Sequence, residues 1–267
     1  MHKTFAIGIV TYQPDEQRLK ENIAAAKAQP EAGAILIADN DKGENLGMAG
    51  GLNQICQQAL DLGYEWVVTL DQDSVMQAGT LSEFARYTNQ DDIAIICPRI
   101  EDRNMGRQYA RSDKGTEFIE HCITAGNLVR LSAWQTVGGF TEDLFIDGVD
   151  FDFCLKLQEY GYKILRTNNV FLLQEVGHGQ AITLPFHKQI SILNHSPLRL
   201  YYIARNYLYI GSQHHQLLHW AIEVAKRMLI VICFEQDKWQ KLRYMFTGIH
   251  HYHKGIMGKM SYKSQHK

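Results

Sequence analysis

The sequence has few cysteines, and their spacing excludes the common cysteine-based frameworks. The 267 residues include 5 cysteines, with no Cys-x-x-Cys pair among them. An odd, scattered set argues against a disulfide scaffold or a zinc ribbon and favours small buried apolar residues in a reducing compartment. Proline is also sparse, at 5 residues, and no low-complexity segment or internal repeat is visible. We therefore expect neither a collagen-like chain nor wholesale disorder.

Long hydrophobic runs are missing as well. The N-terminal apolar run, 5–10, soon meets Tyr12 and Pro14 and is too short for a signal peptide. The longest later run, 228–234, is far below the roughly 20 residues that a membrane-spanning helix needs. We expect a cytoplasmic protein, either soluble or peripheral on the inner face of the cytoplasmic membrane.

Charge of one sign is not in excess over the whole chain, but it is unevenly distributed. The chain has 27 Lys+Arg and 29 Asp+Glu, a net charge of −2 that offers no general attraction to nucleic acid. From Arg199 onward there are 11 bases and 3 acids, whereas the first 198 residues contain 16 bases and 26 acids. We expect two segments, an acidic domain over residues 1–197 and a basic helical region over residues 198–267.

Hydrophobic periodicity predicts alternating strands and helices in the first hundred residues. Continuous apolar runs predict buried strands over 5–11, 34–38, 66–70 and 93–97. Amphipathic spacing predicts helices over 15–29, 49–62 and 81–87. Strands and helices that alternate with short connections indicate an α/β protein with a mostly parallel sheet covered on both faces.

Beyond Pro98 the pattern is looser. Strand-like pieces occur over 118–131, a helix is predicted over 151–160, and 163–173 is extended. From residue 197 helical periodicity dominates. We expect a helical appendage after the sheet domain.

Polar residues follow the predicted strands where a ligand of an α/β sheet binds, outside the carboxyl ends of the strands. Asp39 and Asn40 follow one strand, and Asp71 and Asp73 follow the next. Two carboxylates one residue apart suit a hard cation such as Mg²⁺ or Mn²⁺, held together with substrate phosphates. The alternative for this pair is a solvated turn that caps the next helix. A glycine-bearing loop over 45–53 could bring backbone close to a ligand at a helix start.

A second acidic cluster precedes a predicted helix and comprises Asp147, Asp150 and Asp152. Acids in a first helical turn are favoured by the helix dipole, so capping is one interpretation. Three carboxylates in an aromatic and apolar neighbourhood exceed what capping needs. A carboxylate in such a site can act as a general base toward a hydroxyl.

The ordered series of motifs resembles the family 2 glycosyltransferases of the GT-A fold, and within them the bacterial rhamnosyltransferases. The resemblance runs to about residue 210 and is carried by residues 9–14, 38–40, 45–53, 69–74, 145–156 and 196–206. It implies an enzyme with a GT-A-type, mostly parallel Rossmann-like sheet. It also implies inverting transfer of a sugar, L-rhamnose from dTDP-L-rhamnose, to a saccharide or lipid-linked acceptor in bacterial surface polysaccharide synthesis.

The resemblance also implies residue roles. The donor nucleotide would be bound by residues from three segments, namely Thr11, Tyr12, Asp39, Asn40, Asn45, Gly47, Gly50, Gly51 and Asn53. Asp71 and Asp73 would form the DxD-like metal pair, with Asp73 the more direct ligand of Mg²⁺ or Mn²⁺ and Asp71 also near the donor. Asp150 falls at the position of the catalytic base, Asp147 is the second candidate, and Asp152 belongs to the helix. Arg205 and Asn206 would support the diphosphate or a closing loop.

Two positions depart from the family pattern. A histidine often serves as a further metal ligand after the last strand, whereas this chain has Gln174 to Gly177 there, followed by His178. Either His178 is the ligand through a local shift, or diphosphate and water complete the metal shell; an ordinary loop histidine is the other interpretation. Lys156 stands where arginine is usual, and it gives a point charge without the bidentate fork.

The role of the basic region and the identity of the donor each allow more than one interpretation. Interleaved bases and aromatics after residue 197 fit packing on the catalytic domain together with contact to an anionic membrane surface, and no nucleic-acid motif is present. A UDP-hexose donor would keep every assignment but change the sugar. A nucleotidyltransferase would share the strand ends and the metal pair, and it would not need Asp150 beside an acceptor.

Overall fold

The computed structural model describes residues 4–102, 114–174, 180–183, 189–192 and 194–261. By its internal contacts the chain divides into two compact units. The first comprises Met1–Glu142 and Val149–Glu175, and the second comprises Asp143–Gly148 and Val176–Lys267. The predicted division at residue 197 stays a prediction. Predicted site residue His178 lies outside the described residues.

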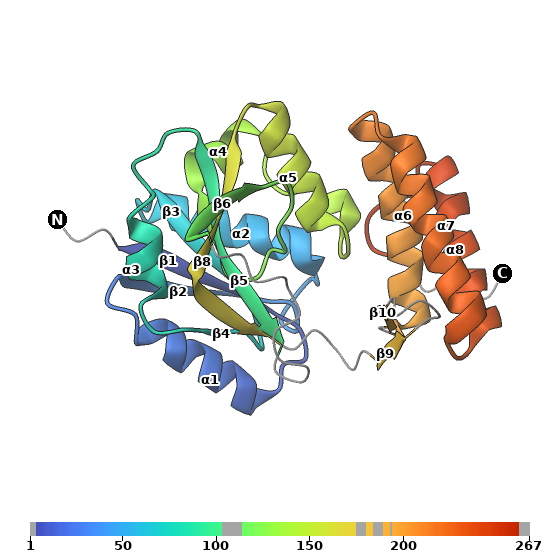
Figure 1. The fold of residues 1–267 in the computed structure, drawn as a ribbon, viewed down its shortest axis with the longest axis horizontal. Coiled ribbons are helices and arrows are strands. Elements are labelled where there is room, and N and C mark those ends of the chain that lie inside the picture. Colours follow the sequence, from blue (N-terminus) through green and yellow to red (C-terminus); the bar gives the residue numbers. More distant parts are fainter. Residues whose placement is uncertain (1–3, 103–113, 175–179, 184–188, 193, 262–267) are drawn as a thin grey trace. The chain divides into compact units, whose positions relative to one another are not determined.

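The first unit is built on a mixed sheet with the strand order β2-β1-β3-β7-β5-β8-β4, in which β6 also pairs with β8 (Figure 1). The strands are β1 (Phe5–Thr11), β2 (Ala32–Asp39), β3 (Trp66–Asp71), β4 (Val75–Met76), β5 (Ile93–Asp102), β6 (Thr116–Ile119), β7 (Asn127–Arg130) and β8 (Lys163–Gln174). β1 pairs in parallel with β2 and β3, and β5 pairs in parallel with β8, whereas β7 is antiparallel to both of its neighbours. The predicted α/β class is confirmed, with antiparallel strands that the periodicity did not reveal.

Four of the five described helices of the first unit lie close to predicted helices, whereas α4 and the short 3₁₀ turn after it were not predicted. The helices are α1 (Glu16–Lys27), α2 (Gly47–Asp61), α3 (Thr80–Ala85), α4 (Leu131–Thr136) and α5 (Val149–Glu159), with a 3₁₀ turn, η1 (Glu142–Leu144), between the last two. α1 begins at the N-cap Asp15, whose carboxylate accepts from the backbone N–H of Arg18. β5 continues through Pro98 to Asp102, five residues beyond the predicted end, where β8 still pairs with it.

Small residues allow α2 to approach the sheet closely. A Cβ on Gly51 would lie 2.9 Å from Val10 and 3.5 Å from Ala38, and a Cβ on Gly8 would meet the side chain of Ile55. Side chains larger than hydrogen at these positions would push α2 off β1 and β2. The close packing holds the start of α2 beside the carboxyl ends of these strands.

The second unit contains α6 (Pro197–Gln213), α7 (Leu217–Phe234) and α8 (Lys238–His253), together with a hairpin of β9 (Gln180–Thr183) and β10 (Gln189–Ile192). The three helices pack side by side (Figure 1) around an apolar core that includes Leu200, Ile203, Val231 and Met245. Ser196 caps α6 and Pro197 occupies its first turn, a typical helix start. Within the described part of the chain, no helix is long and apolar enough to cross a bilayer.

Candidate functional site

The carboxyl ends of β1, β2 and β3 lie at one edge of the sheet. Thr11 is paired in register with Asp39, and Val10 is paired with Asp71. Parallel pairing therefore brings together three segments that are about thirty residues apart along the chain. The expected clustering of Thr11, Asp39 and Asp71 is present at the position where α/β sheets bind ligands.

Thr11 and Tyr12 differ in what they offer a ligand. Thr11 is buried, whereas the Tyr12 side chain is 52% exposed. The backbone N–H of Tyr12 donates to Gln72 Oε1 at 2.9 Å, which ties the end of β1 to the turn after β3. An exposed ring held on a fixed backbone can stack on a planar ligand such as a base.

Asp39 is held in its charged form. Its carboxylate accepts from the backbone N–H of Asp41 at 3.0 Å and lies 3.1 Å from Lys42 Nζ. These contacts lower the pKa of Asp39 below its ordinary value, the backbone hydrogen bond being the larger cause. The side chain is a fixed acceptor at the end of β2.

Two asparagines build the turn that starts α2. Leu46 N–H donates to Asn40 Oδ1 at 2.8 Å, Asn40 Nδ2 donates to the Gly47 carbonyl at 3.1 Å, and Gly47 N–H donates to Asn45 Oδ1 at 2.9 Å. Gly47 has φ +70°, which favours glycine. The N–H groups of Leu46 and Gly47 are therefore used inside the protein and are not offered to a phosphate in this conformation.

The remaining residues of the predicted donor loop lie inside α2 rather than in a loop. Gly51 faces the sheet, and Asn53 uses its whole amide to join α2 to the segment after α4. Asn53 Oδ1 accepts from Trp134 Nε1 and from Phe140 N–H, while its Nδ2 donates to the Phe140 carbonyl and to Glu142 Oε1, at 2.9–3.0 Å. The structure thus assigns Asn53 a structural contact, and its predicted role toward the donor has no hydrogen-bonding group left to act through.

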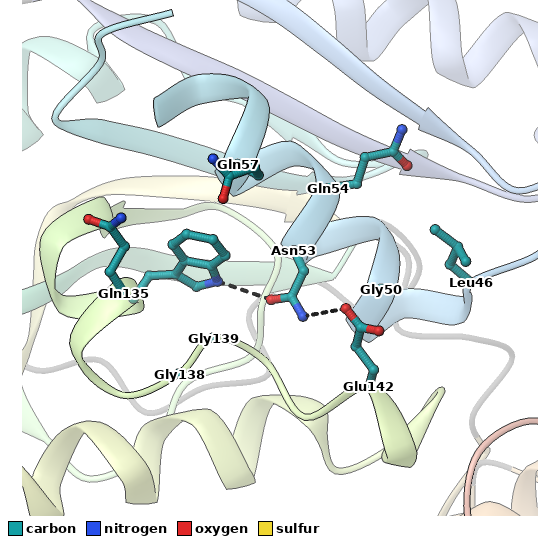
Figure 2. A pocket seen from close by; sticks show the side chains of 10 residues that line it. Leu46, Gly50, Asn53, Gln54, Gln57, Gln135, Gly138, Gly139 and Glu142 are labelled. Carbon is teal, nitrogen blue, oxygen red and sulfur yellow. Dashed lines mark hydrogen bonds between the residues drawn. The ribbon is translucent and has the colours of Figure 1, made fainter. Parts of the chain in front are cut away.

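A groove of about 570 Å³ lies beside this connection (Figure 2). Leu46, the N-cap of α2, lines it together with Gly50 and Asn53 of α2, and Trp134, Gly139 and Glu142 line it from the opposite side. The dashed contacts of Figure 2 run from Asn53 to Trp134 and to Glu142, so Asn53 joins the two sides of the groove. Gly50 lines this groove, whereas its neighbour Gly51 contacts the sheet.

Asp71 and Asp73 flank a turn after β3. Asp71 Oδ2 accepts from Gln174 Nε2 at 2.7 Å, and its carbonyl accepts from Asn22 Nδ2 and from the Ser74 N–H. Asp73 is half-buried, and α3 is capped by Gly79, so the alternative of Asp73 as a helix cap is wrong. Over the described residues no three His, Cys, Asp or Glu side chains converge as a metal site.

The acidic cluster is divided among three environments. Asp152 is 1% exposed and accepts from Thr141 Oγ1 at 2.6 Å, with Lys156 Nζ at 3.5 Å, so it is a buried structural residue of α5. Asp147 belongs to the second unit, where Arg199 Nε donates to it at 2.8 Å. Burial raises the pKa of Asp147 above its ordinary value, although Arg199 and Arg227 act in the opposite direction.

Asp150 is half-buried at the start of α5 and lines a pocket of about 230 Å³, called here the Asp150 pocket. The pocket lies wholly within the first unit. Its other lining residues come from β5, β6, β7, β8, α5 and the segment between β6 and β7. They are Cys97, Pro98, Ile100, Ile119, His121, Cys122, Ile123, Ala125, Asn127, Phe151 and Arg166. Of the carboxylates in the acidic cluster, only Asp150 lines this pocket.

Arg205 and Asn206 support a loop of the second unit. The five N–H donors of the fully buried Arg205 side chain go to Asn206 Oδ1, Tyr201 Oη and the carbonyls of Gly258, Asp143 and Leu144, at 2.7–3.4 Å. Asn206 Nδ2 lies within 2.9 Å of the carbonyls of Leu144, Ile146 and Asp147. The guanidinium has no donor left for a diphosphate, so of the two predicted roles these contacts fit support of a loop.

Sequence reasoning missed three side chains of this region, Gln174, Asn127 and Arg166. Gln174 holds Asp71, while Asn127 and Arg166 line the Asp150 pocket. Each lies on a strand whose pattern is otherwise ordinary, so no local signal distinguishes them. Their proximity to the site comes from strand pairing between distant segments.

The fold is shared with solved glycosyltransferase structures. Residues 1–349 of TarS from S. aureus align with a TM-score of 0.56 over 95% of this chain and 83% of that one, at 12% identity. GalNAc-T7, solved with UDP, GalNAc and Mn²⁺, aligns with a TM-score of 0.55 over 65% of this chain, which spans 44% of that longer protein, also at 12% identity. The fold is that of the GT-A glycosyltransferases.

Sequence comparison shows which glycosyltransferases this chain is similar to. Residues 41–154 match the family model described as glycosyl transferase family 2. The dTDP-rhamnosyl transferase RfbF of Shigella flexneri is 25% identical over 270 aligned positions, which cover 89% of this chain and 90% of that protein. The matched segment is similar to family 2 glycosyltransferase domains, and the chain is a glycosyltransferase that is similar to a bacterial rhamnosyltransferase.

Proposed function

We propose that this glycosyltransferase transfers L-rhamnose from dTDP-L-rhamnose, with inversion, to a saccharide or lipid-linked acceptor in bacterial surface polysaccharide synthesis. The observation that carries the proposal is Asp150, a carboxylate that lines a pocket of about 230 Å³ at the start of α5. The similarity to a dTDP-rhamnosyl transferase over nine-tenths of both chains supports the choice of donor.

In this proposal Asp150 removes the proton of the acceptor hydroxyl. The acceptor oxygen then forms a bond to the anomeric carbon from the face opposite the nucleotide, and the bond from that carbon to the diphosphate oxygen breaks. Attack from the opposite face inverts the anomeric configuration. The base of the nucleotide would stack on Tyr12, and Asp39 would accept a hydrogen bond from it, because both lie at the carboxyl edge of β1 and β2.

Asp71 and Asp73 would hold Mg²⁺ or Mn²⁺. Hard oxygen ligands suit either ion, and with two carboxylates the remaining positions would be filled by diphosphate and water. Such an ion supplies neutralising charge for the leaving nucleoside diphosphate. The half-buried Asp73 has no hydrogen bond or ion pair within the described ranges, which leaves its carboxylate available as a ligand.

The metal assignment predicts that Asp73→Ala abolishes metal-dependent donor binding. Calorimetric titration of dTDP with and without Mn²⁺ measures this effect. Asp61→Ala, an exposed carboxylate at the end of α2, serves as the control. Equal metal dependence of dTDP binding in wild type and Asp73→Ala would refute the assignment.

A donor screen tests the reaction itself. Purified protein is incubated with dTDP-L-rhamnose or with UDP-hexoses, with and without EDTA, and the released nucleotide product is measured. We expect dTDP from dTDP-L-rhamnose. A UDP product would instead indicate the UDP-hexose alternative, and pyrophosphate release would indicate nucleotidyl transfer.

We further propose that α7 contacts an anionic membrane surface. Its outer side carries Leu218, Ile222, Leu229 and Ile232 at helical spacing, exposed at 77%, 45%, 60% and 48%. Trp239, at the start of α8, is 87% exposed. An apolar stripe in a segment with 11 bases and 3 acids is the pattern of an in-plane amphipathic helix on anionic lipid.

Liposome flotation tests this contact. We expect binding to vesicles containing anionic phosphatidylglycerol at low salt, weaker binding at high salt, and loss of binding in Leu229→Ser. Leu62→Ser is the matched control, because Leu62 in the first unit is also 60% exposed. Absence of wild-type binding at low salt would refute the membrane contact and leave the transferase proposal intact.

A further inference from the structure

The loop Asp143–Gly148, called here the Asp143 loop, has an uncommon backbone conformation. Phe145 has φ +65°, Asp147 has φ +58° and Gly148 has φ +84°, all in the left-handed region. For a bulky side chain such as that of phenylalanine this region is sterically unfavourable. Such a backbone persists only where the surrounding contacts over-determine it. The Asp143 loop therefore depends on contacts from other segments to keep its conformation.

Residues 258–260, which follow α8 and are called here the 258–260 segment, contact the Asp143 loop directly. The backbone N–H of Gly258 donates to the Asp143 carbonyl at 2.7 Å. Lys259 Nζ lies 5.9 Å from the centre of the Phe145 ring, within the range of a cation–π contact. The segment and the loop both belong to the second unit. Two residues of the loop, one of them the left-handed Phe145, are thus restrained from the C-terminal side.

Arg205 links the same segment to the same loop a second time. Its Nη1 donates to the Gly258 carbonyl at 2.7 Å, and its Nη2 donates to the Asp143 carbonyl at 3.1 Å. The Asp143 carbonyl therefore accepts from both Gly258 and Arg205. Because Gly258 also accepts from Arg205, a displaced Gly258 would loosen both restraints on this carbonyl.

Tyr202 of α6 provides a third link. The backbone N–H of Met260 donates to Tyr202 Oη at 2.8 Å. The Tyr202 ring stacks on Phe145, with ring centres 5.5 Å apart and an angle of 29° between the planes. Each residue of the 258–260 segment therefore contacts the loop or a side chain that holds it.

The Asp143 loop leads directly into α5. Gly148 is followed by Val149, the first residue of α5, and then by Asp150. Further along, α5 is anchored at Asp152, which accepts from Thr141 Oγ1 at 2.6 Å. The residues between the loop and this anchor, Asp150 among them, are therefore placed by the loop on one side and by the anchor on the other.

We propose that the 258–260 segment is a positioning element for the transfer reaction. With Arg205 it holds the Asp143 loop in its left-handed conformation, and the loop in turn fixes the start of α5, where Asp150 lies. This inference rests on the proposed function for the role of Asp150 as the base. The restraint on the loop involves contacts within the second unit, so it can be tested apart from transfer.

Gly258→Pro removes the direct bond between the segment and the loop. Proline has no N–H to donate to Asp143, and its ring excludes the φ of +72° that Gly258 adopts. We expect kcat for transfer from dTDP-L-rhamnose to fall about tenfold, because a small displacement of the base slows proton transfer. KM for dTDP-L-rhamnose should stay unchanged, because Tyr12 and Asp39, which are proposed to bind the nucleotide, belong to the first unit.

Two further variants separate positioning from loss of stability. Gly258→Asn keeps the N–H, and asparagine tolerates a left-handed backbone, so this variant should retain near wild-type kcat. Gly63→Pro, at the end of α2, likewise removes one left-handed residue, with φ +81°, and one backbone hydrogen bond, to Leu60 at 2.9 Å. It should lower the melting temperature as Gly258→Pro does and leave kcat unchanged. Equal losses of kcat in the two proline variants, or a rise in KM in place of the fall in kcat, would overturn the inference.

Hydrogen exchange of the backbone amides of residues 144–148 tests the restraint without any need for transfer. Exchange requires local opening of the loop. We expect it to be about tenfold faster in Gly258→Pro, as for loss of one hydrogen bond, and unchanged in Gly63→Pro. Unchanged exchange in Gly258→Pro would overturn the inference, whatever the activity. Faster exchange in Gly258→Pro, when the wild type does not transfer L-rhamnose, would overturn the proposed function alone.

Discussion

Asp150 and Asp152 are separated by a single residue on α5 and have different environments. Asp152 is buried and engaged by Thr141 and Lys156, whereas Asp150 lines a pocket. We predict that Asp150→Asn lowers kcat by a factor of about 10² to 10⁴, because the acceptor proton loses its base. Steady-state rates with dTDP-L-rhamnose, together with circular dichroism, measure this effect.

Asp152→Asn is the control for Asp150→Asn. We expect it to lower the melting temperature, because the Lys156 ammonium loses a buried counter-charge. Near wild-type transfer by folded Asp150→Asn would remove Asp150 from the mechanism. Asp147 would then be tested next.

Asp147 makes stability depend on pH. Burial raises the pKa of Asp147 in the folded state, so its contribution to stability is fully present below its ordinary pKa and is lost as pH rises through the folded value. Asparagine does not titrate. We therefore predict that Asp147→Asn gains stability relative to wild type as pH rises from about 4, measured by urea unfolding across a pH series. A difference that does not vary with pH, or that changes in the opposite direction, would contradict the raised pKa.

At the scale of elements, α6 and α8 cross at a glycine. A Cβ on Gly248 would meet the carbonyl oxygen of Tyr201 and lie 3.2 Å from the backbone N of Arg205. Backbone atoms cannot move aside by a rotamer change, so α8 must shift. We predict that Gly248→Ala lowers the free energy of unfolding by about 2 kcal/mol, measured by urea denaturation. Gly115→Ala is the control, because among the described residues its Cβ would meet nothing closer than 3.8 Å.

α7 and α8 are also joined by a buried ion pair. Lys241 Nζ donates to Glu235 Oε2 at 2.8 Å and to Asn194 Oδ1 at 2.6 Å, and Lys241 and Glu235 are each 3% exposed. We predict that Lys241→Met lowers the free energy of unfolding by about 3 kcal/mol, because Glu235 loses its closest counter-charge. Lys226→Met, which breaks the exposed pair with Glu223, should cost at most about 1 kcal/mol. Equal losses in chemical denaturation would show that burial does not strengthen the first pair.

Local patterns predicted strands and helices well where the order of apolar residues along the chain reports which side chains are buried. Continuous apolar runs marked β1, β2 and β3, and the spacing of Leu19, Ile23 and Ala26 marked α1. The antiparallel insertion of β7 between β3 and β5 was not predicted, because the choice of a strand partner is a long-range property. The same reason hides Asn127 and Arg166, whereas the clustering of Asp39 and Asp71 follows from parallel pairing alone.

At the scale of the whole molecule, the net charge of −2 is the sum of an acidic and a basic part. Among the acids after residue 198, Glu223 pairs with Lys226 and Glu235 is buried beside Lys241. Most bases of this segment are therefore not neutralised by its own acids. The charge distribution supports the proposed contact between α7 and anionic lipid.

The loop Asp143–Gly148 belongs to the second unit although the chain on both sides of it belongs to the first. The chain therefore passes between the units at three points rather than one. Consider a hybrid enzyme whose C-terminal helices come from a relative. Its residues at positions 205 and 206 would be foreign, whereas the loop that Arg205 and Asn206 hydrogen-bond, directly before Asp150, would be native. Recombination between such enzymes should succeed only when residues 143–148 and α6 are inherited together. The same rule identifies which segments must be exchanged to graft a new C-terminal region.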